Sequence, residues 1–262
     1  EIATDTVKAV GGYTLADSYE GSGKALHLNG TSSQWLNVTK ADGTSLLTGL
    51  DEMTVSYDIK NERTATNWAF YAAPNAETQE YAIEHYIGFM HNGGNLTVER
   101  YNNTNGRPAS ASAAVGNDWV HIDVVLSSED TAIYVNGVES SRVDSSYSLT
   151  DILGDSSVLQ IGKANWASGE YTQASIDNLK IWDKALTGQE VLNQVPDMFL
   201  QQQVDEIADG ITSLTLENGK NTLSDYNGTV TWKSDMPEVS IAEDGLTAEV
   251  QAPEIGAEDI TG

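Results

Sequence analysis

The stretch SIDNLKIWDKALTGQE, Ser175–Glu190, decides the fold of this chain. Its first half intersperses apolar residues such as Ile176 and Ile181 with polar ones, as a half-buried strand does. The strand pattern then stops, and Thr187 opens a capping box with Glu190 three residues later, ahead of an apolar pair. The stretch therefore predicts a strand followed directly by a short helical turn.

A second stretch, DWVHIDVVLSSEDTAIYVNGVE at Asp118–Glu139, predicts a hairpin made of a Trp-His strand, a short turn and a strand ending in Tyr-Val-Asn-Gly. The two motifs, in this order, resemble the laminin-G-like, concanavalin A-like jelly rolls that bacteria attach to secreted glycoside hydrolases. The resemblance implies a β-sandwich. It says much less about the ligand.

The rest of Ala25–Asp183 fits that expectation. About ten short strands follow one another, separated by Gly, Asn, Asp and Ser, with no helix expected between them. We therefore predict an all-β fold, a two-sheet antiparallel jelly-roll sandwich over residues 1–186, with carbohydrate binding as its expected role.

The remaining chain divides into a helical linker, residues 187–210, and a second β region, residues 211–262. Within the linker, Pro196 interrupts the helical pattern, Asp197 can cap a second helix and Gly210 can end it. The run TVTWKSDMPEVSIAEDG, Thr229–Gly245, resembles the atypical bacterial Ig-like domains that follow such jelly rolls. We expect a partial Ig-like β domain there.

The net charge of the chain limits the classes of partner that it can bind. The chain holds 39 acidic and 13 basic residues, for a net charge of −26, so its surface repels nucleic acid and anionic membranes. It contains no cysteine, which excludes disulfides, and no apolar run that would insert into a membrane. We expect a piece of a larger bacterial protein that is secreted or displayed on the cell surface.

No pattern predicts catalysis. Some jelly-roll hydrolases carry Glu-x-Asp-x-x-Glu on a strand, which sets two carboxylates beside the scissile bond, and this motif is absent. Glu77, Glu80 and Glu84 cluster in an expected loop with irregular spacing and are interpreted as solvated charge. We expect the chain itself to have no catalytic residues and not to be an enzyme.

The resemblance implies one metal, a structural calcium that ties the start of the jelly roll to its last strand. The matching residue in the last strand is Asp177, with Asp17 or Glu20 as the early partner. Calcium takes oxygen ligands of this kind. The alternative is that Asp177 pairs with a lysine or faces water.

A sugar site pairs an aromatic ring with a few fixed hydrogen-bonding groups. Aromatic side chains at strand ends and in loops are the candidates, above all in the loop Ala164–Gln173. Arg100 is either a residue at the rim of a site or a clamp on the ligand. Four tryptophans within expected strands are assigned to packing, namely Trp35, Trp119, Trp182 and Trp232. The candidate ligand-binding residues are Trp166, Tyr171, Trp68, Tyr86, Arg100 and Tyr101.

The sequence thus favours a non-catalytic module that binds a poly- or oligosaccharide and tethers a covalently linked catalytic domain to it. The resemblance implies a parent glycoside hydrolase directed at arabinan or a related hemicellulose. Two alternatives stay open. The chain is a structural spacer or adhesion module without glycan binding, or it is a hydrolase in its own right.

Overall fold

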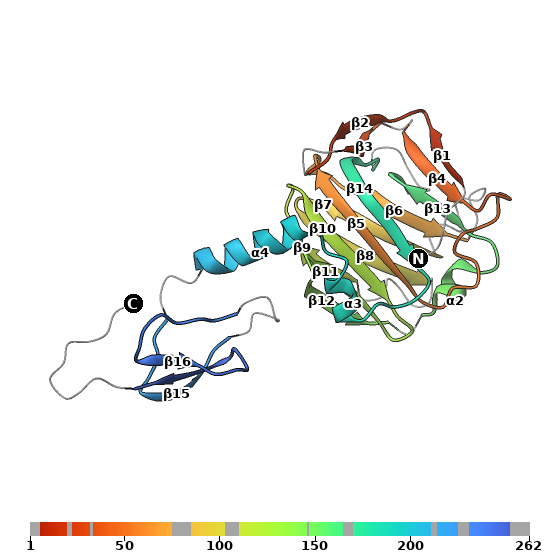
Figure 1. The fold of residues 1–262 in the computed structure, drawn as a ribbon. Helices are drawn as coiled ribbons and strands as arrows, with labels where there is room; N and C mark the ends of the chain where they lie inside the picture. The colour runs from red at the N-terminus through yellow and green to blue at the C-terminus, as the bar shows by residue number, and fades with distance from the viewer. Residues whose placement is uncertain are drawn as a thin grey trace. The chain divides into compact units, whose positions relative to one another are not determined.

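The computed structural model describes most of the chain, which forms two compact units, Glu1–Pro196 and Asp197–Gly262 (Figure 1). The sequence analysis placed the end of the jelly roll earlier, at residue 186. The described residues are 6–19, 23–31, 34–74, 85–102, 110–145, 147–164, 170–210, 214–224 and 231–251.

The first unit contains two antiparallel sheets of seven strands each within its described part. In both sheets, strands distant in sequence are neighbours, because β13 pairs with both β4 and β6, and β14 pairs with both β3 and β5. Sheet A has the order β1 (Thr6–Val10), β4 (Trp35–Thr39), β13 (Val158–Ile161), β6 (Asn67–Ala73), β7 (His85–Asn92), β8 (Asn95–Asn102) and β9 (Ala111–Ala114). Sheet B has the order β12 (Val138–Asp144), β11 (Asp130–Val135), β10 (Val120–Leu126), β5 (Met53–Asn61), β14 (Gln173–Trp182), β3 (Lys24–Asn29) and β2 (Thr14–Asp17).

One core lies between the sheets. Alternate residues along a strand point to opposite faces, and inward residues from most of the strands of both sheets join a single hydrophobic cluster. Sheet B contributes residues such as Val55 and Ile122, and sheet A contributes Phe70, Phe89 and Val98. The rings of Phe70 and Phe89 stack with centroids 4.5 Å apart. The predicted two-sheet sandwich is therefore confirmed.

The outer face of sheet B carries a smaller apolar cluster. Val125 and Tyr134 point outward there and pack with Leu186 and Val191. Val191 belongs to α3 (Gly188–Leu192), whose N-cap is Thr187 with the expected capping box to Glu190. The strand and helical turn predicted from Ser175–Glu190 are both present, and the turn packs on the sandwich.

One expectation for this unit was wrong. A short helix, α2 (Leu149–Leu153), interrupts the succession of strands between β12 and β13. The Ser148 side chain caps it by accepting from the Asp151 amide at 3.0 Å. Its apolar residues Leu149, Ile152 and Leu153 all enter the core. Five residues are too few for helical periodicity to stand out from a loop.

The second unit begins with α4 (Asp197–Gly210), whose limits match the residues expected to start and end it. Its sheet has the strand order β15 (Gly219–Thr222), β17 (Thr247–Val250) and β16 (Val239–Ile241), all antiparallel. The second β region is therefore present. Its assignment as Ig-like stays a prediction.

Candidate functional site: a pocket on the outer face of sheet A

A pocket of about 800 Å³ opens on the outer face of sheet A. Its floor comes from β4 and β13, and its walls come from Lys8 of β1 and from the turns at residues 40–48 and 155–157. All of these residues lie within the first compact unit. This is the size of cavity that holds a small ligand.

The alternation of side chains along β4 and β13 determines which residues form the floor of the pocket. In β4, Leu36 and Val38 pack toward the core, so Trp35 and Asn37 point to the outer face. In β13, Gln160 likewise points outward between two core residues. The two strands pair antiparallel with Gln160 opposite Asn37, which brings both amide side chains to the middle of the floor.

The floor combines an aromatic ring with unsatisfied polar atoms. Gln160 donates through Nε2 to Asn37 Oδ1 at 3.3 Å. Although Gln160 is only 5% exposed, its Oε1 has no hydrogen-bond partner in the part of the chain that the structure describes. The buried Nε1 of Trp35 also has none there. Buried polar atoms are normally paired, so these two unpaired atoms distinguish the floor from the rest of the sheet surface.

The walls are held in place by short side chains. Ser45 and Ser157, one from each turn, share a hydrogen bond of 2.6 Å between their hydroxyls. In the first turn, Thr44 donates to Asp42 Oδ1 from both its amide and its hydroxyl, and these bonds hold the pKa of Asp42 below its usual value. Hydroxyl side chains therefore hold the two turns of the wall in place.

The sequence does not predict this site, because the position of Trp35 within a strand favours a packing role. The strand reads Trp-Leu-Asn-Val-Thr, and only the residues that alternate with Trp35 reach the core. Trp35 is instead half-buried and lines the pocket. Trp35 becomes part of a site only because β4 pairs with β13. The local sequence does not encode that pairing.

Three of the predicted ligand-binding residues do come together elsewhere on the same face. Trp68, Tyr86 and Tyr101, joined by Tyr71, form an aromatic cluster on the outer side of β6, β7 and β8. Ring centroids of Trp68 and Tyr86 lie 6.0 Å apart, and those of Tyr86 and Tyr101 lie 5.5 Å apart. Val158 packs against this cluster and also lines the pocket, so the two are adjacent.

The aromatic cluster is packed closely. Trp68 is 3% exposed and Tyr86 is 1% exposed, while Tyr101 is half-buried. Trp68 Nε1 donates to Glu170 Oε2 at 2.8 Å, and the Tyr86 hydroxyl donates to Glu99. Gly88 provides the space for the indole, because a Cβ there would lie 2.4 Å from Trp68 Cζ3. In this conformation the rings of Trp68 and Tyr86 stabilise the sheet and are closed to a ligand.

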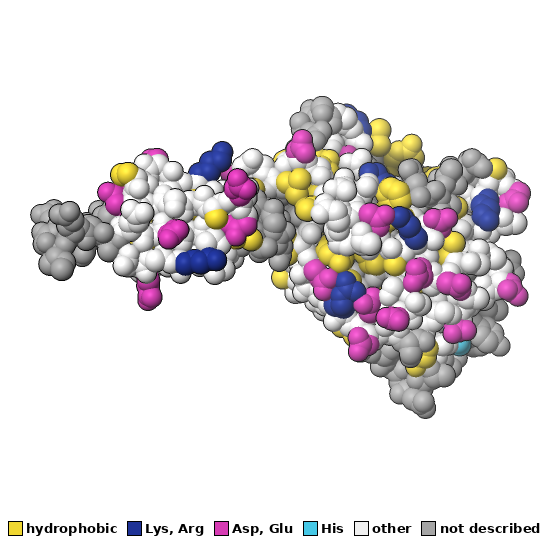
Figure 2. Space-filling model, turned by 60° about the horizontal axis from the view of Figure 1, so that its bottom comes forward, with side chains coloured by type: hydrophobic (Ala, Val, Ile, Leu, Met, Phe, Trp, Pro, Cys, Tyr) yellow, Lys and Arg dark blue, Asp and Glu magenta, His cyan; other side chains and the backbone are white. Residues whose placement is uncertain are grey.

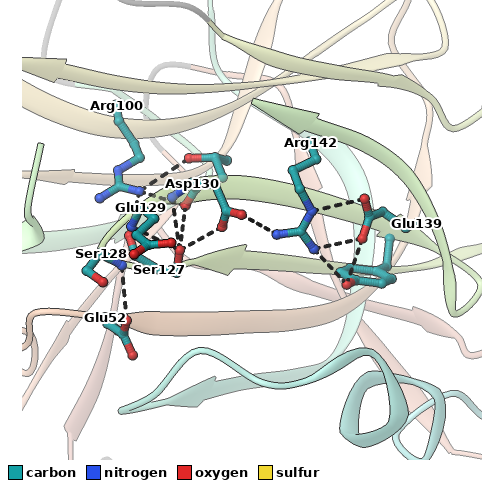
Figure 3. Close-up of polar contacts among 10 residues, drawn as sticks. Glu52, Arg100, Ser127, Ser128, Glu129, Asp130, Glu139 and Arg142 are labelled. Atoms are coloured by element: carbon teal, nitrogen blue, oxygen red, sulfur yellow. Dashed lines mark hydrogen bonds and ion pairs between the residues drawn. The ribbon is translucent and has the colours of Figure 1, made fainter. Parts of the chain in front are cut away.

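Arg100, the predicted rim residue or ligand clamp, points to the other side of β8. It is 2% exposed and lies on the inner face with Val98. Figure 3 shows its guanidinium directed toward Ser127 and Asp130. Its Nη1 donates to the carbonyls of Ser127 and Asp130, both at 2.9 Å, and its Nη2 donates to the carbonyl of Tyr147. The structure therefore separates Arg100 from the aromatic residues with which it was grouped.

The last pair of candidates came from the loop before β14. Tyr171 is half-buried, and its backbone carbonyl accepts from Arg63 Nη1 at 3.0 Å. Trp166 lies outside the described residues, as do Glu77, Glu80, Glu84 and Glu20.

The two residues predicted to bind calcium lie on neighbouring parts of the chain but have separate partners. Asp17, at the exposed end of β2, pairs with Lys24. Asp177 in β14 accepts from Ser18 Oγ at 2.7 Å, which ties the start of the fold to its last strand. Within the described ranges, no three His, Cys, Asp or Glu side chains are grouped so as to hold a metal ion. Those residues alone do not form a calcium site, and calcium stays a prediction.

The chain also matches a known protein family. Residues 27–192, more than half of the chain, match the model of the Concanavalin A-like lectin/glucanases superfamily. The chain belongs to this superfamily. The matched range contains β4, β13 and both turns of the pocket, and it ends with α3.

Solved structures show the same fold at low identity. Domain 4 of AbnA, a GH43 extracellular arabinanase from Geobacillus stearothermophilus solved with arabinotriose, is 18% identical and has a TM-score of 0.53, over 73% of this chain and 87% of that chain. The botulinum neurotoxin serotype D binding domain is 12% identical with a TM-score of 0.54, over 75% of this chain and 46% of that chain. The binding domain of Paraclostridial Mosquitocidal Protein 1 is 15% identical with a TM-score of 0.52, over 75% and 47%.

These three similar structures are named as domains of larger proteins, and two of them as binding domains. No curated protein sequence matches the chain. Among the described residues, no helix is long and apolar enough to cross a membrane.

Proposed function

We propose that this superfamily member is a non-catalytic carbohydrate-binding module, and that the pocket on sheet A is its glycan site. The observation that carries the proposal is the floor of the pocket. The half-buried indole of Trp35 lies beside the amides of Asn37 and Gln160, one of which has an unsatisfied buried oxygen. A sugar ring has an apolar C–H face and a polar rim, so it complements this arrangement.

The similar arabinanase domain supports the proposal at the level of the fold, because its structure holds arabinotriose. By analogy, we propose that this chain belongs to a secreted or cell-surface bacterial protein and tethers a linked glycoside hydrolase to arabinan or a related hemicellulose. A tether of this kind raises the local concentration of the enzyme at its substrate. A structural calcium and an Ig-like second unit remain part of this proposal.

The test is affinity electrophoresis in gels containing arabinan, xylan, β-glucan or pectin, followed by calorimetry on any polysaccharide that slows migration. We expect at least one to retard the protein, and we expect Trp35→Ala to weaken binding about tenfold, since an aromatic contact is worth roughly 1 kcal/mol or somewhat more. Trp119→Ala is the matched control. Trp119 is also half-buried, but its ring packs on Tyr19 with centroids 5.8 Å apart and does not line the pocket.

Two outcomes would replace the proposal. If no polysaccharide retards the folded protein, the spacer or adhesion alternative is favoured. If the protein releases sugar from any of the polymers, and if substitution of a single carboxylate stops the release, the chain is a hydrolase.

A further inference from the structure

Lysine side chains gather around the pocket of a chain that is otherwise acidic. Lys8 and Lys40 line the pocket, and the Lys163 ammonium lies 4.5 Å from the centroid of the Trp35 ring. The whole chain holds only 13 basic residues against 39 acidic ones, and Figure 2 shows acidic side chains scattered over the face it displays. Around the pocket the ratio is reversed.

The nearby negative charges do not cancel these lysines. Asp155 is the one acidic residue among those that line the pocket, and Asp42 lies in the turn beside Lys40. The bonds from Thr44 and the attraction of Lys40 lower the pKa of Asp42, so its carboxylate stays charged and offsets part of the positive charge. Three ammonium groups and two carboxylates leave a local excess of positive charge.

Lys8 and Lys40 are also available to a ligand, whereas the Lys163 ammonium already contacts the Trp35 ring. In the described part of the chain, none of Lys8, Lys40 and Lys163 has a carboxylate within 4.0 Å, whereas Lys24 and Lys184 form ion pairs with Asp17 and Glu190. Lys8 and Lys40 are exposed. An ammonium group without a protein partner at the rim of a polar pocket is suited to an anionic group on the ligand.

We propose that the pocket binds a sugar that carries a carboxylate, a uronic or sialic acid, at the end of a glycan or in a short one. This inference rests on the proposed glycan site and adds its charge preference. The indole and amides bind the ring, and Lys8 and Lys40 bind the carboxylate. The acidic surface outside the pocket repels a long polyanion and so disfavours its binding. At physiological salt this repulsion is screened beyond about 8 Å.

The experiment compares acidic sugars with their uncharged counterparts on the full chain. Calorimetry would measure binding of trigalacturonic acid, of its fully methyl-esterified form, of sialyllactose and of lactose. We expect the acid form of at least one pair to bind about fivefold or more tightly than its partner, as two exposed ion pairs allow. Which pair shows the preference distinguishes uronic from sialic acid.

The lysine variants test where the preference arises. In Lys8→Gln/Lys40→Gln the acid and neutral forms are expected to bind equally, while Lys60→Gln, an exposed lysine outside the pocket, should leave the preference unchanged. The preference should also shrink as NaCl rises from 50 to 500 mM. Circular dichroism of each variant confirms that it is folded.

Failure of this inference is distinguishable from failure of the glycan site. If neutral glycans bind as tightly as acidic ones, or if the lysine variants keep the preference, the charge assignment is overturned while Trp35-dependent binding still supports the site. If neither acidic nor neutral glycans bind the wild type, the glycan site and the charge assignment are both wrong.

Discussion

The charged side chain of Arg100 lies in the space between the two sheets. Three backbone carbonyls, those of Ser127, Asp130 and Tyr147, accept from its guanidinium. One side chain thus fixes the segment before α2 and the turn before β11, and Figure 3 shows Arg100 beside Ser127 and Asp130 of that turn. Burial lowers the pKa of Arg100 to about 10, with partial compensation from Asp130 and Glu52. The side chain therefore stays charged at neutral pH.

Arg100→Met should destabilise the protein strongly. The variant leaves three carbonyls without their donor, and each buried group that loses its partner costs roughly 1–3 kcal/mol, so we expect a loss of at least about 3 kcal/mol in the free energy of unfolding. Urea denaturation measures it. Arg142→Met is the control, because Arg142 is 41% exposed and bridges Asp130 and Glu139 near the surface, which predicts a loss below about 1 kcal/mol. Equal losses in the two variants would contradict the structural role of Arg100.

His121 is the second buried charge that the structure explains. It points to the outer face of sheet B, with Nδ1 2.6 Å from Asp58 Oδ1 and Nε2 3.0 Å from Asp123 Oδ2. Burial on its own would lower the pKa of His121, but the bonds and charges of Asp123 and Asp58 outweigh it and raise the pKa to about 9. Asp123 is itself fully buried, so its carboxylate faces His121 and not solvent.

The pKa of His121 predicts a pH dependence of stability. Because the folded pKa lies above the unfolded value of about 6.5, the stabilisation is complete below pH 6.5 and is lost as pH rises to 9. The loss amounts to up to about 3 kcal/mol. Urea denaturation between pH 6 and 9.5 measures it, and His121→Gln should flatten the dependence in this range. A wild type whose stability is constant over that range would show that the His121 pKa is not raised.

At the scale of strands, local pattern was sufficient for most of the sandwich. The short strands expected between Ala25 and Asp183 are present, among them β6, β7 and β8. In β8, Val98 and Arg100 are two residues apart, and both are buried on the same side of the strand. What alternation does not encode is which strands become neighbours.

That limit explains the difference between the predicted site and the pocket. Trp68, Tyr86 and Tyr101 were chosen as aromatic residues near strand ends, and they meet in space, yet two of them are buried by packing that only the sheet order creates. Trp35 and Gln160 lie in one floor because β13 inserts between β4 and β6. The two residues are 125 positions apart in the sequence. No local signal marks such a pair.

At the scale of the molecule, the two large sheets and the pocket proposed as the glycan site belong to the first compact unit. Both seven-stranded sheets, α3 and every residue of the pocket lie before Asp197. A variant that stops at Pro196 should therefore fold by itself, with a cooperative thermal transition, and should bind the same glycans within about twofold of the full chain. Calorimetry on both proteins makes the comparison, with Trp35→Ala in the shorter protein as the control in which binding should again weaken about tenfold. A folded short variant that no longer binds would show that residues after Asp197 contribute to the site.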